Sequence, residues 1–163
     1  MPTTYEPIAT TTLGSAQSSV TFSTISGSYT DLIFVVNAGA STAVNLWLEV
    51  NSDTGSNYSV TRLSGNGTSA SSDRKSSATK FEMTAQSYVA DAIEFNAIVS
   101  FQNYSNSTTY KTIIGRMNLA AGGTDAVVGL WRSTSAITTI VAKTSSGTFD
   151  SGSTFTLYGI KAA

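Results

Sequence analysis

The feature that most constrains this chain is a short alternation of apolar and polar residues, repeated along the sequence and interrupted by turns. In Val44–Asn51, for example, Val and Leu occupy every second position, and Asn, Trp and Glu fill the positions between them. Successive side chains of a β-strand point to opposite faces of its sheet, so a period of two indicates a strand with one buried face. The pattern therefore predicts a β-protein.

Ten segments carry this pattern, and their spacing is typical of a sandwich or a barrel. Gly or Asn occurs in the connections, as at Ser64–Gly67 and Ser146–Gly147, where a turn needs a positive φ. We therefore expect an all-β fold, an antiparallel β-sandwich of jelly-roll type with about ten short strands. The predicted strands are Ile8–Leu13, Ser19–Ile25, Asp31–Asn37, Ala43–Asn51, Tyr58–Leu63, Glu94–Tyr104, Thr109–Asn118, Ala126–Arg132, Ile137–Lys143 and Thr154–Lys161.

Two neighbouring stretches do not follow the pattern. Ser69–Lys80 is polar and is expected to be a loop, whereas Lys80–Asp91 fits either a strand or one or two helical turns. No linker rich in Pro or charge divides the 163 residues, so one domain is expected to fill positions 1–163, with a short extended segment at 1–8.

Leu32–Val36 and Phe95–Phe101 are apolar on both faces, which places them in the middle of a sheet that is covered on both sides. A two-layer sandwich covers only one face of each sheet. The second apolar face is therefore expected either to form a subunit interface or to be covered by Lys80–Asp91.

The composition excludes several classes of chemistry. The chain has no His and no Cys, so it lacks the imidazole or thiolate of the common nucleophilic couples and the usual ligands of zinc, haem and iron–sulfur clusters. Its net charge of −1, with scattered basic residues, gives no footprint for nucleic acid. The longest apolar run, Leu32–Val36, is far below the roughly 20 residues that span a bilayer. We expect no enzyme activity, metal, cofactor, nucleic-acid partner or membrane insertion.

Carboxylates are the one catalytic device that this composition permits. Glu49 and Glu94 lie on predicted strands and form a candidate glycosidase pair, but two solvated strand charges are the better interpretation. The segment Asn51–Asn57 has alternating oxygen donors, as a calcium loop has, but it lacks the distal bidentate Glu of such a loop. A hairpin turn is the better interpretation of this segment.

The candidate contact residues are aromatic or basic. Trp47 and Trp131, the latter followed by Arg132, are candidate platforms for a sugar ring, and their alternative is a place in the core or at an interface. Arg74 and Lys75, with Lys80 nearby, form the one basic cluster, which is expected either to be solvated or to contact an acidic partner.

Several segments resemble a family of small β-rich virion surface proteins of tailed bacteriophages, frequent in aquatic phages. The resemblance covers most of the chain, and the segments that carry it are Tyr5–Ala16, Ser19–Ile25, Tyr29–Leu32, Asn51–Tyr58, Gly129–Ser133 and Gly152–Lys161.

The resemblance implies a jelly-roll domain, often a trimer, that sits on the virion surface and gains affinity from multivalency. It implies a non-enzymatic structural role, first as a head decoration or cement protein. In that role the segment 1–8 and a rim of loops would contact the major capsid protein. The alternative role is a tail-fibre or spike tip that binds a host surface glycan. The family defines no catalytic residues that match positions of this chain.

Overall fold

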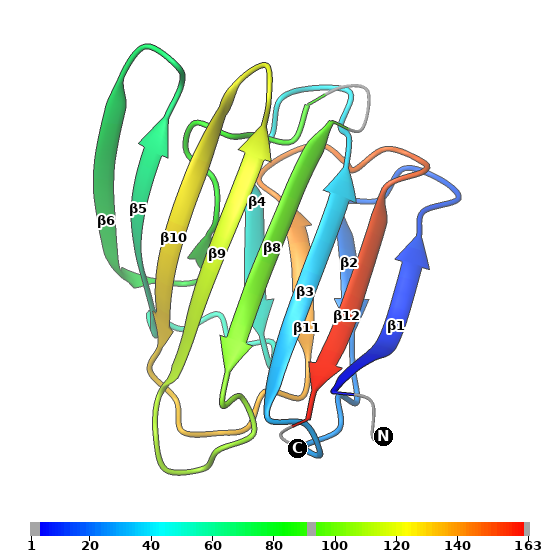
Figure 1. Ribbon diagram of the computed structural model, residues 1–163, viewed down its shortest axis with the longest axis vertical. Helices are drawn as coiled ribbons and strands as arrows, with labels where there is room; N and C mark the ends of the chain where they lie inside the picture. The colour runs from blue at the N-terminus through cyan, green and yellow to red at the C-terminus, as the bar shows by residue number, and fades with distance from the viewer. Residues whose placement is uncertain (1–3, 91–93, 162–163) are drawn as a thin grey trace.

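The computed structural model of this chain describes residues 4–90 and 94–161, which form β-strands and no helix (Figure 1). The strands belong to two antiparallel sheets packed face to face, so the predicted antiparallel β-sandwich of jelly-roll type is confirmed. The described strands are β1 (Tyr5–Thr12), β2 (Ser19–Phe22), β3 (Asp31–Ala38), β4 (Leu46–Val50), β5 (Tyr58–Gly65), β6 (Ala70–Ala78), β7 (Phe81–Glu82), β8 (Phe95–Gln102), β9 (Lys111–Leu119), β10 (Gly123–Trp131), β11 (Ile140–Thr144) and β12 (Thr154–Ile160).

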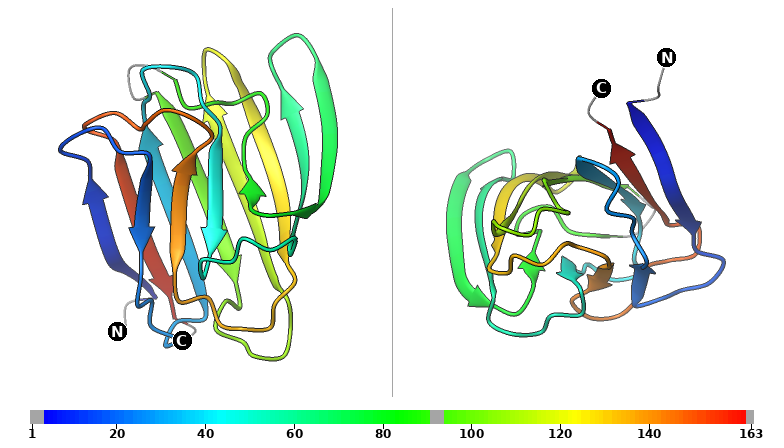
Figure 2. Two further views of the ribbon diagram at one scale, coloured as in Figure 1. Left: turned by 180° about the vertical axis from the view of Figure 1, so that it is seen from behind. Right: turned by 90° about the horizontal axis from the view of Figure 1, so that it is seen from below.

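The two sheets differ in size. The larger sheet has eight strands in the order β1-β12-β3-β8-β9-β10-β5-β6, and the smaller has four in the order β2-β11-β4-β7. Figure 1 views the large sheet from outside, with the small sheet behind it, and Figure 2 shows the small sheet from the opposite side. The large sheet therefore has one face on the core and one face turned away from the small sheet.

Alternation along the strands fills the space between the sheets. On β3, the inward Leu32, Phe34 and Val36 are completely buried. Leu46 and Leu48 of β4 face them from the small sheet and are also completely buried. This is the arrangement that the period of two predicts.

The two strands that are apolar on both faces, β3 and β8, are neighbours inside the large sheet, as expected. The segment that follows Lys80 does not cover their outward side. Phe81 and Met83 are completely buried in the core, and β7 pairs with β4 of the small sheet. Within the described part of the chain, Lys80–Ala90 thus lies on the side of the large sheet that faces the small sheet. Asp91 falls outside the described residues. The expected cover from this segment is not found.

The prediction of a loop at Ser69–Lys80 was wrong, because β6 occupies most of it. β6 is an edge strand whose side chains are almost all exposed, so no buried face imposes an alternation on its sequence. A bulge opposite Ser59 interrupts the pairing with β5, and Ser77 has a φ of 55° there. Bulges and charged residues are common on edge strands because they hinder pairing with other chains.

At the other edge of the large sheet, the predicted extended segment 1–8 is part of a strand from Tyr5 onward. Tyr5 pairs with Ile160, and Glu6 with Gly159 of β12. Residues 1–3 lie outside the described part. The described portion of this segment is therefore fixed in the sandwich by the sheet's hydrogen bonds.

Candidate functional site

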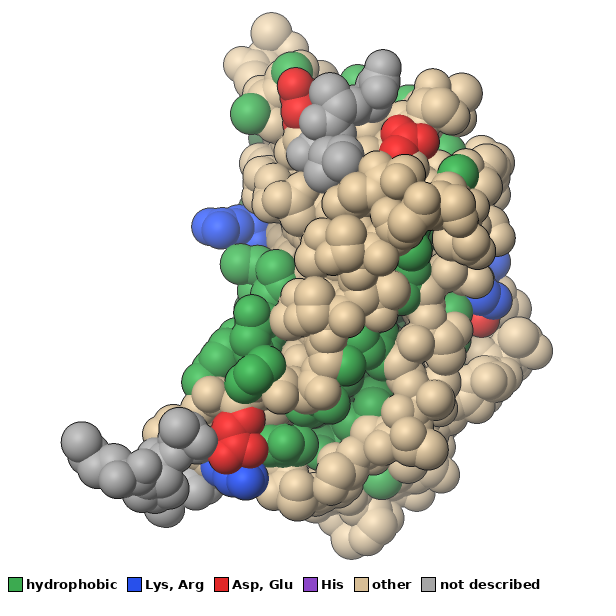
Figure 3. All heavy atoms as spheres, turned by 90° about the vertical axis from the view of Figure 1, so that its right-hand side faces the viewer, with side chains coloured by type: hydrophobic (Ala, Val, Ile, Leu, Met, Phe, Trp, Pro, Cys, Tyr) green, Lys and Arg blue, Asp and Glu red, His purple; other side chains and the backbone are tan. Residues whose placement is uncertain are grey.

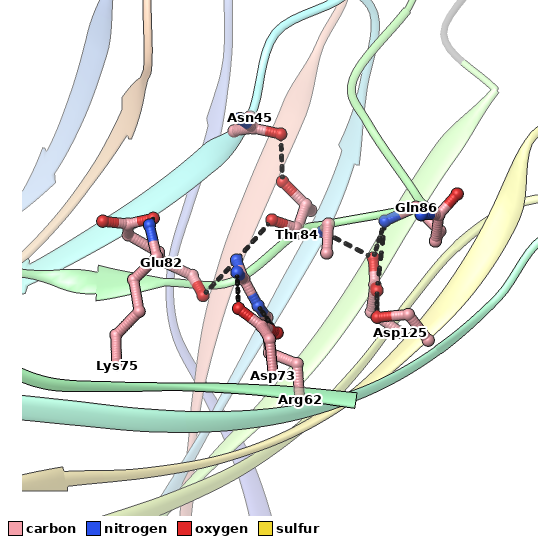
Figure 4. Close-up of polar contacts among 10 residues, drawn as sticks. Asn45, Arg62, Asp73, Lys75, Glu82, Thr84, Gln86 and Asp125 are labelled. Atoms are coloured by element: carbon pink, nitrogen blue, oxygen red, sulfur yellow. Dashed lines mark hydrogen bonds and ion pairs between the residues drawn. The ribbon is translucent and has the colours of Figure 1, made fainter. Parts of the chain in front are cut away.

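A polar cluster lies between the β5–β6 hairpin and the segment that follows β7 (Figure 4). Arg62 of β5 is buried there, and its Nε donates to Asp73 Oδ1 of β6 at 2.8 Å. A second guanidinium nitrogen donates to the other oxygen of the same carboxylate, and Nη1 donates to the carbonyl of Thr84 at 2.7 Å. Arg62 thus connects β5 to its neighbour β6 and also to the chain after β7.

Asp125 of β10 is the completely buried carboxylate of this region. The backbone N–H groups of Ala85 (3.0 Å), Gln86 (3.2 Å) and Ser87 (2.8 Å) donate to it, and so do the hydroxyls of Ser64 and Ser87. Burial opposes the ionisation of Asp125, but these hydrogen bonds outweigh burial and hold its pKa below the ordinary value. The carboxylate therefore replaces a strand partner for the backbone of residues 85–87.

The polar groups of this cluster are satisfied by the protein itself. Arg62 uses all three of its nitrogens on internal acceptors, and Asp125 accepts from five donors. A group that serves catalysis or ligand binding needs a donor or acceptor left for the ligand. The contacts of Arg62 and Asp125 thus hold the segment after β7 in position and do not form a binding site for a ligand.

The structure places Trp131 in the core, only 2% exposed. Its Nε1 donates to Asp53 Oδ2 at 2.6 Å, and the side chain of Asn57 and the backbone N–H of Gly55 donate to the same carboxylate. Burial opposes the ionisation of Asp53, but these hydrogen bonds hold its pKa below the ordinary value. The oxygens of this loop are thus engaged in the turn, and the ring of Trp131 has no free face for a sugar.

The second Trp lies on the outer side of the small sheet. The ammonium of Lys80 sits over the ring of Trp47, 4.0 Å from the ring centroid, and the buried indole nitrogen has no partner in the described part. The cation covers one side of the ring and is stabilised by the ring's quadrupole. The side chain of Trp47 is half-buried, and Lys80 already covers one side of its ring.

The two candidate catalytic carboxylates are not brought together. Glu49 is buried on β4 and pairs with Lys143 of β11 at 2.6 Å. Glu94 is exposed and immediately precedes β8 of the other sheet. The described residues also contain no group of three or more Asp and Glu side chains that could hold a metal ion.

The outer face of the large sheet, the face turned away from the small sheet, carries an exposed apolar surface. Its large apolar side chains are Leu63 (62% exposed), Ile98 (44%), Ile114 (51%) and Val128 (53%). Ile114 and Val128 lie directly opposite each other on β9 and β10. Figure 3 shows this face in profile, with hydrophobic side chains gathered along its left-hand side.

The predicted basic cluster divides between two sides of β6, because neighbouring residues of a strand point in opposite directions. Lys75 forms an ion pair with Glu82 of the small sheet. Arg74 is exposed and lies opposite Thr61 of β5, on the outer face. Arg74 and Arg132 line one hollow of about 470 Å³ on this face, so the structure brings these two candidate residues together.

Arg74 and Arg132 were predicted from the sequence as contact residues, but the apolar residues beside them were not. A signal for those residues is present in the sequence. Ile113–Ile114 and Val127–Val128 are pairs of consecutive apolar residues in two segments expected to be strands, and one member of each pair must face outward. Only the pairing of β9 with β10 shows that the outward members are neighbours.

By fold, the chain belongs to the class of all-β proteins built as a two-sheet antiparallel sandwich. No family model matches it, and a search of curated proteins finds no match. Among solved structures it is similar to the galectin LEC-6 of Caenorhabditis elegans, with 14% sequence identity and a TM-score of 0.33 over 94% of this chain and 96% of the galectin. No helix in the described part is long and apolar enough to cross a membrane.

Proposed function

We propose that this chain is a non-enzymatic structural protein on the surface of a tailed-phage particle. In this proposal it is a head decoration protein that stabilises the capsid, acts as a homo-oligomer, expected to be a trimer, and binds the major capsid protein. The sequence resemblance supports the phage assignment. The proposed mode of action, binding through a protein interface, rests on the exposed apolar residues of the outer face of the large sheet.

The outer face has the size of a protein interface. Seven spacings of about 4.8 Å between its eight strands, and strands of about 27 Å, give a projected area of about 900 Å². One partner of a standard interface contributes about 800 Å². Clustered exposed apolar residues of this kind are typical of surfaces that bind other proteins. Binding to the assembled shell would stabilise that shell by linkage.

The proposal is tested on purified particles. Quantitative mass analysis should find this protein at a copy number comparable with that of the major capsid protein. Particles stripped of the protein should lose resistance to heat while still adsorbing to cells. Absence from the particles would overturn the proposal. Normal heat resistance with lost adsorption would instead support a receptor-binding tip on the tail.

The contact surface is tested with a variant that combines Ile114→Asn and Val128→Asn. Both positions are about half exposed, so the variant should remain folded and lose no more than about 2 kcal/mol of its free energy of unfolding. The variant should fail to add back to stripped particles. A control with Ser19→Asn and Thr21→Asn, exposed on β2 of the other sheet, should add back normally. Equal binding of the two variants would show that the outer face is not the contact surface.

A further inference from the structure

The hollow on the outer face lies where β5, β9 and β10 run side by side, with β6 at its edge. Ile114, Val128 and Leu130 supply apolar surface, Thr61 and Gln102 are polar neighbours, and the guanidinium groups of Arg74 and Arg132 complete the lining. An open hollow of this kind suits a short apolar segment that also carries a charge.

The charges of the molecule are distributed unevenly. Four of the nine cations form ion pairs with carboxylates, and these are Arg62, Lys75, Lys143 and Lys161. Lys80 lies over Trp47, and Lys111 is buried and donates to two backbone carbonyls. Among the described residues, the remaining cations have no carboxylate partner, and they are Arg74, Arg116 and Arg132.

These three arginines all belong to the outer face, whereas Lys80, which also has no carboxylate partner in the described part of the chain, lies over Trp47 of the small sheet, and Lys111 is buried. Arg116 lies opposite Ile98 and Ala126 on the neighbouring strands, and Arg74 and Arg132 flank the hollow. A chain with a net charge of −1 thus presents a locally positive surface beside its exposed apolar side chains. Opposite charge on a partner would be complementary to this surface.

Arg132 is held in position at the hollow. Its Nη2 donates to the hydroxyl of Ser59 at 2.5 Å and its Nη1 to the carbonyl of Tyr58 at 3.5 Å, which fixes the plane of the guanidinium. These two bonds use two of its five N–H donors. The remaining donors of a charged guanidinium match a carboxylate better than they match a neutral group. The geometry favours a carboxylate that sits between Arg132 and Arg74.

No aromatic residue lines the hollow, and a sugar ring usually binds by stacking on one. An acidic peptide segment, with apolar side chains beside its carboxylates, fits both the apolar lining and the two cations. We infer that this hollow binds a carboxylate-bearing apolar segment of a partner protein. This inference rests on the proposed function, because it assigns the partner chemistry of the same outer face.

The test uses two blocked pentapeptides, Leu-Glu-Leu-Glu-Leu and Leu-Gln-Leu-Gln-Leu, and glucuronate as the sugar probe. Methyl resonances of Ile114, Val128 and Leu130 report binding by NMR. The Glu peptide should shift them saturably, and the Gln peptide should bind about tenfold more weakly, as loss of a charged hydrogen bond implies. Equal binding of the two peptides would overturn the inference. Saturable binding of glucuronate without binding of the Glu peptide would also overturn it, in favour of an acidic glycan.

Variants separate the local site from general electrostatic attraction. Arg74→Gln with Arg132→Gln should weaken binding of the Glu peptide about tenfold or more. Lys80→Gln with Lys161→Gln removes the same total charge at positions that do not line the hollow, and it should leave binding within about twofold. Equal weakening by both pairs would contradict a site at the hollow.

Failure here is distinguishable from failure of the proposed function. The first case is that the Glu peptide does not bind, or that the Arg74 and Arg132 variant does not weaken its binding. If the Ile114 and Val128 variant still fails to join particles, only the carboxylate inference falls. If the Glu peptide binds as expected but the protein is absent from particles, the hollow stands and the proposed function falls.

Discussion

At the scale of single residues, buried polar groups fix the segments that the sheets alone do not hold. Asp125 is the strongest case, because it is completely buried and serves three consecutive backbone N–H groups. Tyr58 is a second case. Its hydroxyl joins β5 of the large sheet to the carbonyl of Val50 in the small sheet and to that of Asp53. Each of these residues gives the free energy of unfolding a pH dependence of known sign.

Asp125→Asn should lower the free energy of unfolding by about 3 kcal/mol near neutral pH, because an amide cannot accept from all five donors. The pKa of Asp125 is lower in the folded chain than in the unfolded chain, so the unfolded chain binds more protons in acid. The contribution is therefore complete above about pH 4 and is lost as the pH falls through the folded pKa. Urea unfolding at several pH values should show the wild type and the variant converging in acid.

The control for this experiment is Glu94→Gln, which removes the same charge from an exposed position. Its free energy of unfolding should stay within about 0.5 kcal/mol of the wild type near neutral pH. A gap between Asp125→Asn and the wild type that keeps its size in acid would contradict the role given to the carboxylate.

Tyr58 has the opposite effect: in the alkaline range its contribution to the free energy of unfolding falls as the pH rises. Burial raises its pKa to about 12, against the effect of its hydrogen bond to Val50, and nearby carboxylates add to the increase. The unfolded chain ionises near pH 10, so the contribution of Tyr58 is complete below pH 10 and is lost as the pH rises through about 12. Two pKa units correspond to roughly 3 kcal/mol.

Tyr58→Phe should therefore be less stable than the wild type at pH 8, by about 1–2 kcal/mol for the lost hydrogen bonds. Between pH 10 and 12 it should lose less stability than the wild type does, as measured by urea unfolding. Tyr110→Phe, at an exposed position, serves as the control and should keep the wild-type pH dependence. Identical slopes for Tyr58→Phe and the wild type would show that this hydroxyl does not titrate with unfolding.

At the scale of strands, the prediction from sequence succeeded where one face is buried and failed where none is. β3 and β8 were placed inside a sheet because they have apolar residues on both faces. β6 was missed because an edge strand without a buried face carries no alternation, and β7 was left open because two residues give no period. The turn glycines Gly67 and Gly147 do have positive φ, whereas after β4 this conformation falls on Asn51 and Ser52.

The candidate site was predictable only in part, for a related physical reason. Alternation tells which residues share a face of one strand, but the neighbours across strands depend on register. Arg74 and Arg132 are far apart in sequence, and β5 and β10 bring them to one hollow. Trp131 was named as a candidate sugar platform, and its partner Asp53, which lies in a distant loop, could not be inferred from the local sequence.

Since β6 packs on the core through an apolar side chain only at its end, at Ala78, its attachment should depend on Arg62 and Asp73. Asp73→Ala should cost about 1.5–3 kcal/mol, because it leaves the buried guanidinium with fewer acceptors. Hydrogen exchange should accelerate for the amides of β6 and remain unchanged for those of β9 and β10. Ser71→Ala, on the same strand, should leave exchange unaltered. Equal acceleration throughout the large sheet would mean that β6 is not an independently opening element.

At the scale of the whole molecule, the two sheets share one core, and side chains of one sheet contact side chains of the other directly. Phe22 packs edge-to-face on Phe34 with ring centroids 5.5 Å apart, and Tyr58 of the large sheet packs on Phe81 of the small sheet at 4.9 Å. Arg62 adds a polar link to the chain after β7. Neither sheet has a hydrophobic core of its own, so neither should persist without the other.

The two Trp residues allow this to be measured, because Trp47 lies on the small sheet and Trp131 on the large one. In the single-Trp variants Trp47→Phe and Trp131→Phe, fluorescence and far-UV circular dichroism should give the same urea midpoint, whichever sheet the remaining Trp reports. Trp131→Phe should have the lower midpoint, because it removes the hydrogen bond to Asp53. Two separated transitions in either variant would show that the sheets unfold as independent units and that the shared core does not couple them.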